Sequence, residues 1–170
     1  NMDLSALIKS KEDLDKVLGE FLDNLLINEY EMREAYELVM ILPVKYYGNG
    51  SYDRWIRVGW ALANISKRML IVWIAFSARS DSFCYNDISE ICERWSQFNV
   101  NNGLRKGSIM MWAKQDAIKE YKKIHENSVD YYLNQSIKNI SLLGISKNEK
   151  NLGCGDADIA KILYILYKDS

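Results

Sequence analysis

Histidine, proline and paired cysteines are scarce in this sequence. It contains one histidine (His125), one proline (Pro43) and three cysteines, Cys84, Cys92 and Cys154, with no CxxC pair. A single histidine leaves almost no material for a histidine-based metal site or a Ser/Cys–His catalytic dyad. An odd number of unpaired cysteines is typical of reduced intracellular thiols. We therefore expect an intracellular chain that holds no metal, binds no cofactor of its own and carries no catalytic residues.

Long apolar runs are also missing. None approaches the length of a membrane span, and the first residues lack the charged-then-apolar pattern of a secretion signal. Apolar residues nevertheless make up 48% of the 170 positions, which is enough to bury the core of one domain. We expect a folded domain with no membrane partner.

The net charge of −1 conceals a division along the chain. Residues 1–44 hold four basic and ten acidic side chains, whereas residues 45–125 hold thirteen basic and seven acidic ones. All five tryptophans also lie in the second block. Segregated charge of this kind is more informative than the total, because it indicates a basic module that suits a polyanionic partner.

The spacing of apolar residues at three and four positions predicts helices throughout, and no segment has the pattern of a strand. The predicted fold class is therefore all-α, a helical bundle of about six to seven helices. Helices are expected over 5–27, 31–42, 52–65, 67–79, 85–98, 109–126 and, with a weaker pattern, 128–143. Residues 144–155 read as a linker, and a further helix is expected over 158–169. Ser51 or Asn49, Asn86 and Ser108 are the expected N-caps of three of these helices.

The stretch SYDRWIRVGWALANISKRM (51–69) predicts a helix with two different faces. Trp55 and Gly59 lie on its apolar face, while Arg54, Arg57, Asn64 and Arg68 track an opposite stripe with Lys67 at its edge. Glycine costs about 1 kcal/mol relative to alanine inside a helix, so Gly59 indicates a closely packed neighbouring helix. The basic stripe is either a solvated face or a surface that meets a partner.

Several spaced motifs of this region are similar to a known family. The region of about residues 38–121 resembles the second type of primase C-terminal domain, through the motifs YDRWIRVGWAL, WIAFSARS, CERW and GLRKGSIMMWAKQD in this order. That domain is found in primase–helicases of large DNA viruses, phages and mobile elements. The matching positions are Trp55, Val58, Gly59, Trp60, Ala61, Leu62, Trp73, Phe76, Ser77, Ser80, Cys92, Trp95, Gly103, Leu104, Gly107, Ser108, Trp112, Ala113, Lys114 and Asp116. The chain departs at Ala117, where the family often has proline. The final DADIAKILYILYKD resembles the segment that leads into the helicase half of such proteins.

The resemblance implies three regions and a role. Residues 1–37 would be acidic helices leading from the primase domain, 38–125 the primase C-terminal bundle, and 126–170 a linker and first helix toward the helicase. Such a domain would help the primase hold single-stranded template and the initiating nucleotide, and would link it to the helicase. Nucleoside triphosphate and Mg²⁺ would belong to the full-length protein. A viral origin would place it at the replication site in the host cytoplasm.

Basic residues of the middle block are the candidate nucleic-acid contacts, because phosphate contacts provide affinity with little sequence choice. The candidates are Arg54, Arg57, Lys67, Arg68, Arg79, Arg105, Lys106 and Lys114. The loop GLRKGS, with Gly103, Gly107 and Ser108, is either a plain turn with a serine cap or a phosphate-binding loop at a helix start. Tyr46, Tyr47 and Tyr85 are candidates for stacking on a base.

Two alternatives remain open. The basic face could instead dock on acidic surfaces of the same protein, which would make the chain a structural spacer that binds no nucleic acid. The apolar segment 159–167 could form a homo-oligomer through the C-terminal helix.

Overall fold

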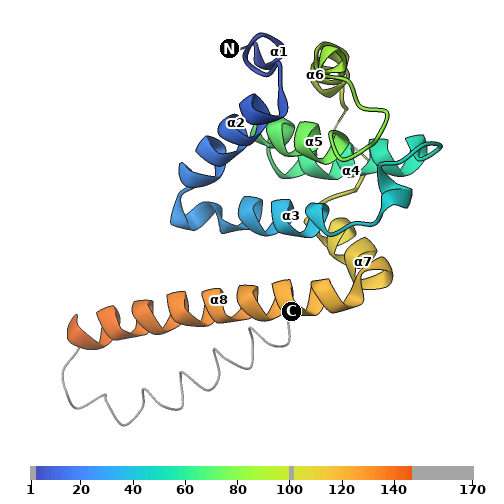
Figure 1. Ribbon diagram of the computed structural model, residues 1–170. Coiled ribbons are helices and arrows are strands. Elements are labelled where there is room, and N and C mark those ends of the chain that lie inside the picture. Colours follow the sequence, from blue (N-terminus) through green and yellow to red (C-terminus); the bar gives the residue numbers. More distant parts are fainter. Residues whose placement is uncertain (1–2, 100–101, 147–170) are drawn as a thin grey trace. The chain divides into compact units, whose positions relative to one another are not determined.

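The computed structural model describes residues 3–99 and 102–146, with side chains as far as residue 141, and the regular elements in these ranges are all helical (Figure 1). The α-helices are α1 (Leu4–Leu7), α2 (Lys11–Asp23), α3 (Tyr30–Met40), α4 (Tyr52–Ile65), α5 (Leu70–Ser77), α6 (Ile88–Ser96), α7 (Lys106–Asp116) and α8 (Ile118–Ser146). Short 3₁₀ helices cover Ile27–Glu29, Val44–Tyr46, Lys67–Met69 and Tyr85–Asp87. The predicted all-α class is confirmed.

The chain divides into two compact units, Asn1–Tyr121 and Lys122–Ser170. The first holds α1 to α7 and, with them, all the predicted nucleic-acid contacts. Most of α8 belongs to the second, in which Tyr131 and Tyr132 pack edge to face. The first part of the predicted linker is helical, since α8 continues to Ser146. The rest of the linker lies outside the described residues, as do Cys154 and the helix expected over 158–169.

Helix α5 is the centre of the first unit. Its sequence, LIVWIAFS, is apolar on all sides, and every residue from Ile71 to Ser77 is buried. A helix without a polar face is stable only when neighbours cover it all round. Helices α2, α3, α4 and α6 all contact α5, while α1 lies beside α6 (Figure 1). The expectation that this segment is the buried centre is confirmed.

Aromatic rings fill the space between α4, α5 and α6. Trp73 is fully buried and stacks on Trp55 with 4.5 Å between ring centroids. Trp95 and Phe98 pack on Trp73 at 5.8 and 5.1 Å. The indole N–H groups are satisfied internally: Trp55 donates to Ser77 Oγ at 2.7 Å, and Trp95 donates to Lys67 O at 3.1 Å. Because buried N–H groups are costly when unpaired, these bonds fix the orientation of the rings.

Gly59 makes room for this cluster. A Cβ atom at residue 59 would lie 2.6 Å from Trp73 Cε2 and 2.8 Å from Cζ2, closer than atoms can pack. Helix α4 therefore approaches α5 only because residue 59 lacks a side chain. The close approach predicted from Gly59 is confirmed, and the neighbour is the indole of Trp73.

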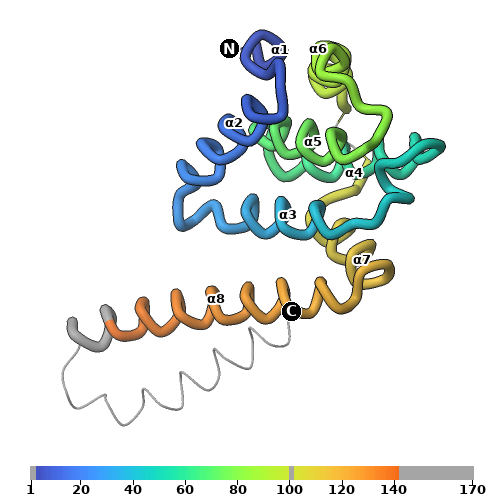
Figure 2. Tube along the Cα trace, viewed as in Figure 1, coloured from blue at the N-terminus to red at the C-terminus, as the bar shows by residue number. Residues whose placement is uncertain are grey.

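Two predicted helices are interrupted. The segment 5–27 breaks between α1 and α2 (Figure 2), where Ile8 is fully buried and Ser10 Oγ accepts a hydrogen bond from the Asp13 N–H at 3.2 Å. Ser10 therefore begins a new helix. The segment 109–126 breaks at Ala117, whose φ and ψ of −148° and 55° are not helical.

Three predicted caps also differ. Ser51 precedes α4, but its hydroxyl donates to Gly48 O at 2.5 Å instead of capping the helix. Asn86 lies within a 3₁₀ turn before α6, and Asp87 is the residue that precedes α6. Helix α7 begins at Lys106, so Ser108 is its third residue instead of its cap.

The space around Gly59 and Gly19 predicts opposite effects of changing each to alanine. Gly59→Ala should destabilise the protein by roughly 1–3 kcal/mol, because the new methyl group collides with a ring that three other aromatic side chains hold in place. Gly19→Ala, inside α2 with open space around it, should stabilise by about 0.5–1 kcal/mol. Urea unfolding followed by circular dichroism measures both, and equal stability of the two variants would contradict the packing described.

Candidate nucleic-acid interface

The predicted nucleic-acid contacts are distributed over four parts of the first unit. Arg54 and Arg57 lie on α4. The others are Lys67 and Arg68 in the turn before α5, Arg79 just after α5, and Arg105, Lys106 and Lys114 at the start and along α7. They differ in one respect that matters for binding: some are held by other parts of the protein and some are not.

Two of these cations form ion pairs with the acidic N-terminal block. Arg68 pairs with Glu29. Because α4 ends at Ile65, Arg68 lies beyond this helix and does not extend its basic stripe. Lys106 Nζ lies 2.5 Å from Glu34 Oε1, and Glu34 is only 5% exposed. A buried carboxylate requires a partner charge. These two cations therefore hold the acidic and basic blocks of the sequence together.

Lys67 and Arg79 are bound to backbone carbonyls. Arg79 donates to Met40 O at 2.6 Å, at the end of α3, and its guanidinium lies 4.5 Å from the Tyr47 ring centroid. This places a positive charge at the negative end of a helix. Lys67 donates to Trp95 O at 3.3 Å and lies 5.7 Å from the Trp95 ring centroid. Both side chains stabilise the fold in these positions.

Four of the cations, Arg54, Arg57, Arg105 and Lys114, are exposed. Their side chains make no hydrogen bond and no ion pair in the described ranges 3–99 and 102–146. Arg54 and Arg57 are three residues apart and therefore neighbours on α4. Lys114 lies further along α7.

Asn64 ties the Arg105 loop to the same helix. Asn64 Nδ2 donates to Asn102 Oδ1 at 2.9 Å and to Leu104 O at 2.5 Å. These bonds hold the segment that leads to Arg105 against the last turn of α4. We call Arg54, Arg57 and Arg105 the open basic surface.

The glycine-rich loop forms a turn and a reciprocal cap. Gly103 has a φ of +75°, a conformation that glycine adopts at little cost. The Arg105 N–H donates to Ser108 Oγ at 3.2 Å, and the Ser108 N–H donates to Arg105 O at 2.9 Å. Gly107 lies in the first turn of α7. A phosphate contact by this loop stays a prediction.

Asp116 fixes the end of α7. Lys45 Nζ donates to its Oδ1 at 2.7 Å and the Tyr46 hydroxyl to its Oδ2 at 2.5 Å. These two bonds lower the pKa of Asp116, with a smaller contribution from the charge of Arg54. The pKa of Tyr46 is raised by burial and by the bond to the carboxylate. Tyr46 is 5% exposed, so it is not available to stack on a base as predicted.

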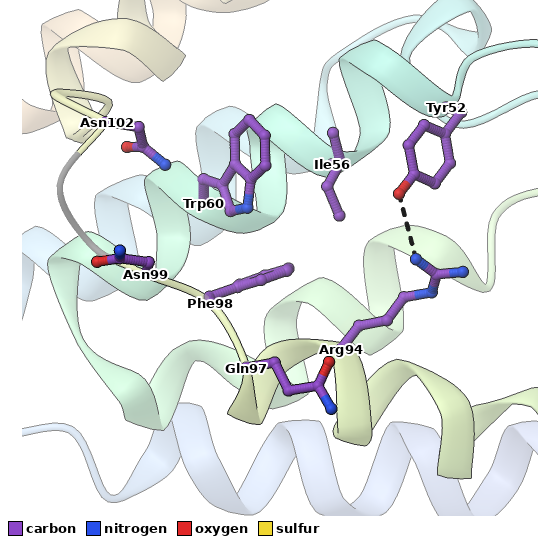
Figure 3. A pocket seen from close by; sticks show the side chains of 8 residues that line it. All are labelled: Tyr52, Ile56, Trp60, Arg94, Gln97, Phe98, Asn99 and Asn102. Carbon is purple, nitrogen blue, oxygen red and sulfur yellow. Dashed lines mark hydrogen bonds between the residues drawn. The ribbon is translucent and has the colours of Figure 1, made fainter.

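Sequence reasoning overlooked a pocket of about 490 Å³ between α4 and the end of α6 (Figure 3). Tyr52, Ile56 and Trp60 form the α4 side at intervals of four residues, a spacing that was visible in the sequence. The facing residues are Arg94, Gln97, Phe98, Asn99 and Asn102. All of these facing residues except Arg94 follow the end of α6 at Ser96, where periodicity gives no signal.

The described ranges hold neither a metal-binding cluster nor a membrane span. Within them, no group of three or more His, Cys, Asp or Glu side chains is arranged to hold a metal ion. Cys84 is exposed and Cys92 is half-buried, both as free thiols, and burial raises the pKa of Cys92. No helix there combines the length and apolar character that crossing a bilayer requires.

The buried ion pair predicts a contrast between two lysines of α7. Lys106→Ala should lower the free energy of unfolding by about 3–5 kcal/mol, because it leaves the Glu34 carboxylate buried without its partner charge. Lys114→Ala, which removes an exposed lysine from the same helix, should change it by less than about 0.5 kcal/mol. Urea titration of both variants tests this, and a Lys106→Ala protein as stable as the wild type would exclude a structural role for the pair.

The lowered pKa of Asp116 predicts a pH-dependent contribution to stability. A carboxyl group whose pKa is lower in the folded than in the unfolded state stabilises the fold above its ordinary pKa of 3.8, and this contribution is lost as the pH falls through the folded-state pKa. Asp116→Asn should therefore cost roughly 1–2 kcal/mol at pH 7. Thermal melting should show the Tm difference from the wild type shrinking between pH 5 and pH 2. A constant difference would indicate that the charge of Asp116 is not involved.

A comparison with protein families supports the resemblance to a primase C-terminal domain that the sequence motifs indicate. Residues 35–113 match the family model described as Primase C terminal 2 (PriCT-2). The matched segment begins within α3 and ends within α7, and so includes the tryptophan cluster, Gly59 and the open basic surface. A search of the curated proteins and one of the solved structures found no match. Residues 35–113 are therefore similar to a primase-associated C-terminal domain.

Proposed function

We propose that this chain is a non-catalytic helical accessory domain of a viral-type replicative DNA primase–helicase. It assists the binding of single-stranded template, and of the initiating nucleotide, during primer synthesis, and it links the primase to the helicase. Its partners are single-stranded DNA and the primase and helicase domains of the same polypeptide. The observation that carries the proposal is the open basic surface within the segment that matches a primase C-terminal family.

The open basic surface has the chemistry of a phosphate-binding site. Its three guanidinium groups present planar arrays of N–H donors that match the geometry of phosphate oxygens. They make no ion pair in the described ranges 3–99 and 102–146, so a phosphate displaces no protein partner. Three such contacts correspond to a slope of about −2 in a plot of log affinity against log salt for a single strand. Binding to the detached domain is therefore weak and salt-dependent.

A structural spacer is the second candidate, and a specific observation favours it. Glu29 and Glu34 already neutralise Arg68 and Lys106, so part of the basic block faces the acidic block of the same chain. On this alternative the remaining arginines would dock on the primase domain. Oligomerisation through residues 159–167, which lie outside the described residues, stays a prediction.

Fluorescence anisotropy of a labelled single-stranded oligonucleotide at two salt concentrations tests the proposal. The wild-type chain should bind weakly at low salt, and binding should fall as salt rises. Arg54→Glu combined with Arg57→Glu should abolish binding at low salt. Tm should change little, because both side chains are exposed and make no ion pair in the described ranges, and the charge of Arg54 is the smallest of the contributions to the pKa of Asp116.

The matched control is Lys11→Glu combined with Lys16→Glu. This double variant changes the net charge equally but places the changes on exposed positions of α2, so it should bind nearly as well as the wild type. An equal loss in both double variants would mean that net charge matters and the open basic surface does not. No binding by the wild type at low salt would favour the spacer.

A further inference from the structure

The pocket between α4 and the end of α6 has features of a ligand site. Its volume of about 490 Å³ is in the range of small-molecule sites, roughly 300–1,000 Å³. On the α4 side, Trp60 projects toward Phe98 and Tyr52 projects toward Arg94 (Figure 3). We propose that this pocket binds one nucleotide unit through its base. This inference rests on the proposed function, since it assigns a base-binding site beside the open basic surface.

The aromatic side chains supply a stacking wall that is fixed in advance. Trp60 packs edge-on against Phe98, with 6.3 Å between centroids and 75° between planes. Phe98 is in turn held by Trp73 and Trp95. Tyr52, at the other end of the pocket, is 53% exposed. Stacking on exposed aromatic rings is how proteins hold unpaired bases, and it tolerates any base.

Two polar groups at the aromatic wall have no partner among the residues that the structure describes. The Trp60 indole N–H donates to no acceptor in the described part of the chain, unlike the indoles of Trp55, Trp73 and Trp95. The Gln97 side chain is exposed and makes no hydrogen bond there. Amide side chains offer both donors and acceptors, as the edge of a base does. The site therefore combines a stacking surface with hydrogen-bonding groups at its rim.

The charge around the pocket favours a phosphate. Arg94 bonds to the Tyr52 hydroxyl at 3.2 Å and to the exposed Glu90 at 3.1 Å, which leaves other guanidinium N–H groups for a ligand. Arg57 precedes Trp60 by three residues, so it lies beside it on α4. Among the described residues, no carboxylate lines this pocket, whereas Asp87 and Glu90 line a second pocket of about 400 Å³ that shares Tyr52 and Arg94 with the first. The two carboxylates outnumber the one cation, Arg94, in the second pocket, which makes it less favourable for a phosphate than the first.

The test compares two labelled strands that have the same number of phosphates, one of thymidines and one with abasic sites. The wild-type chain should bind the thymidine strand about tenfold more tightly, because only that strand supplies bases to stack. Trp60→Ala and Tyr52→Ala should each reduce this preference several-fold, while the affinity for either strand should still fall as salt rises. Tyr52 is exposed, so its variant should fold even if removal of the Trp60 indole disturbs Phe98.

Tyr85→Ala is the matched control. Tyr85 is a half-buried tyrosine whose pKa is raised by burial and by the charges of Asp15 and Glu12, and these carboxylates repel phosphate there. Its removal should leave the preference unchanged. Competition between unlabelled ATP and the labelled strand separates the two sources of the base. If ATP competes with the strand for the wild type but not for Trp60→Ala, a free nucleotide occupies the pocket. If ATP does not compete and the preference for the thymidine strand is present, a base of the strand occupies it.

Two results would overturn the inference and leave the proposed function standing. One is equal affinity of the wild type for the thymidine and abasic strands without competition by ATP. The other is a strand preference that persists in both the Trp60→Ala and Tyr52→Ala proteins. Failure of the proposed function is different in kind, since neither strand would then bind at low salt.

Discussion

The contact between Gly59 and Trp73 determines how the first unit is built. Trp73 can lie flat between α4 and α5 only because residue 59 has no side chain. Once Trp73 is in place, Trp55 stacks on one part of the ring system while Trp95 and Phe98 pack on the rest. Helices α4, α5 and α6 are thus positioned by one indole. A single interaction of this kind constrains a fold strongly, because close-packed rings have few alternative arrangements.

The division of charge along the sequence has two different consequences in the structure. Glu34 with Lys106 and Glu29 with Arg68 join the acidic helices to the basic module, so part of the charge stabilises the fold. Arg54, Arg57 and Arg105 are left without such partners in the part of the chain that the structure describes. Counting charges could not separate these groups, because pairing depends on residues up to 72 positions apart meeting in the fold. The sequence predicts a basic module, and only the structure identifies its unpaired members.

The helices were predictable where the local pattern was unambiguous. Helix α4 has the predicted bounds, Tyr52–Ile65, and the apolar character of α5 correctly placed it at the centre. The break before α2 had a local signal that the long apolar stripe obscured, since Ser10 followed by Asp13 is a capping pattern. The break at Ala117 had none in this chain, because alanine favours helices. At this break, the last residue of α7, Asp116, is hydrogen-bonded to Lys45 and Tyr46.

Helix α4 presents different chemistry on three sides. Gly59 faces the tryptophan cluster, Arg54 and Arg57 face solvent, and Tyr52 and Trp60 line the pocket beside α6. Because the first side is close-packed, the other two cannot shift independently of the core. Groups held on a rigid helix lose little conformational freedom when a ligand binds, so more of their interaction energy is available as affinity. The packing of Trp73 against Gly59 therefore holds both the open basic surface and the pocket in fixed positions, which the proposed binding of one single strand to both would require.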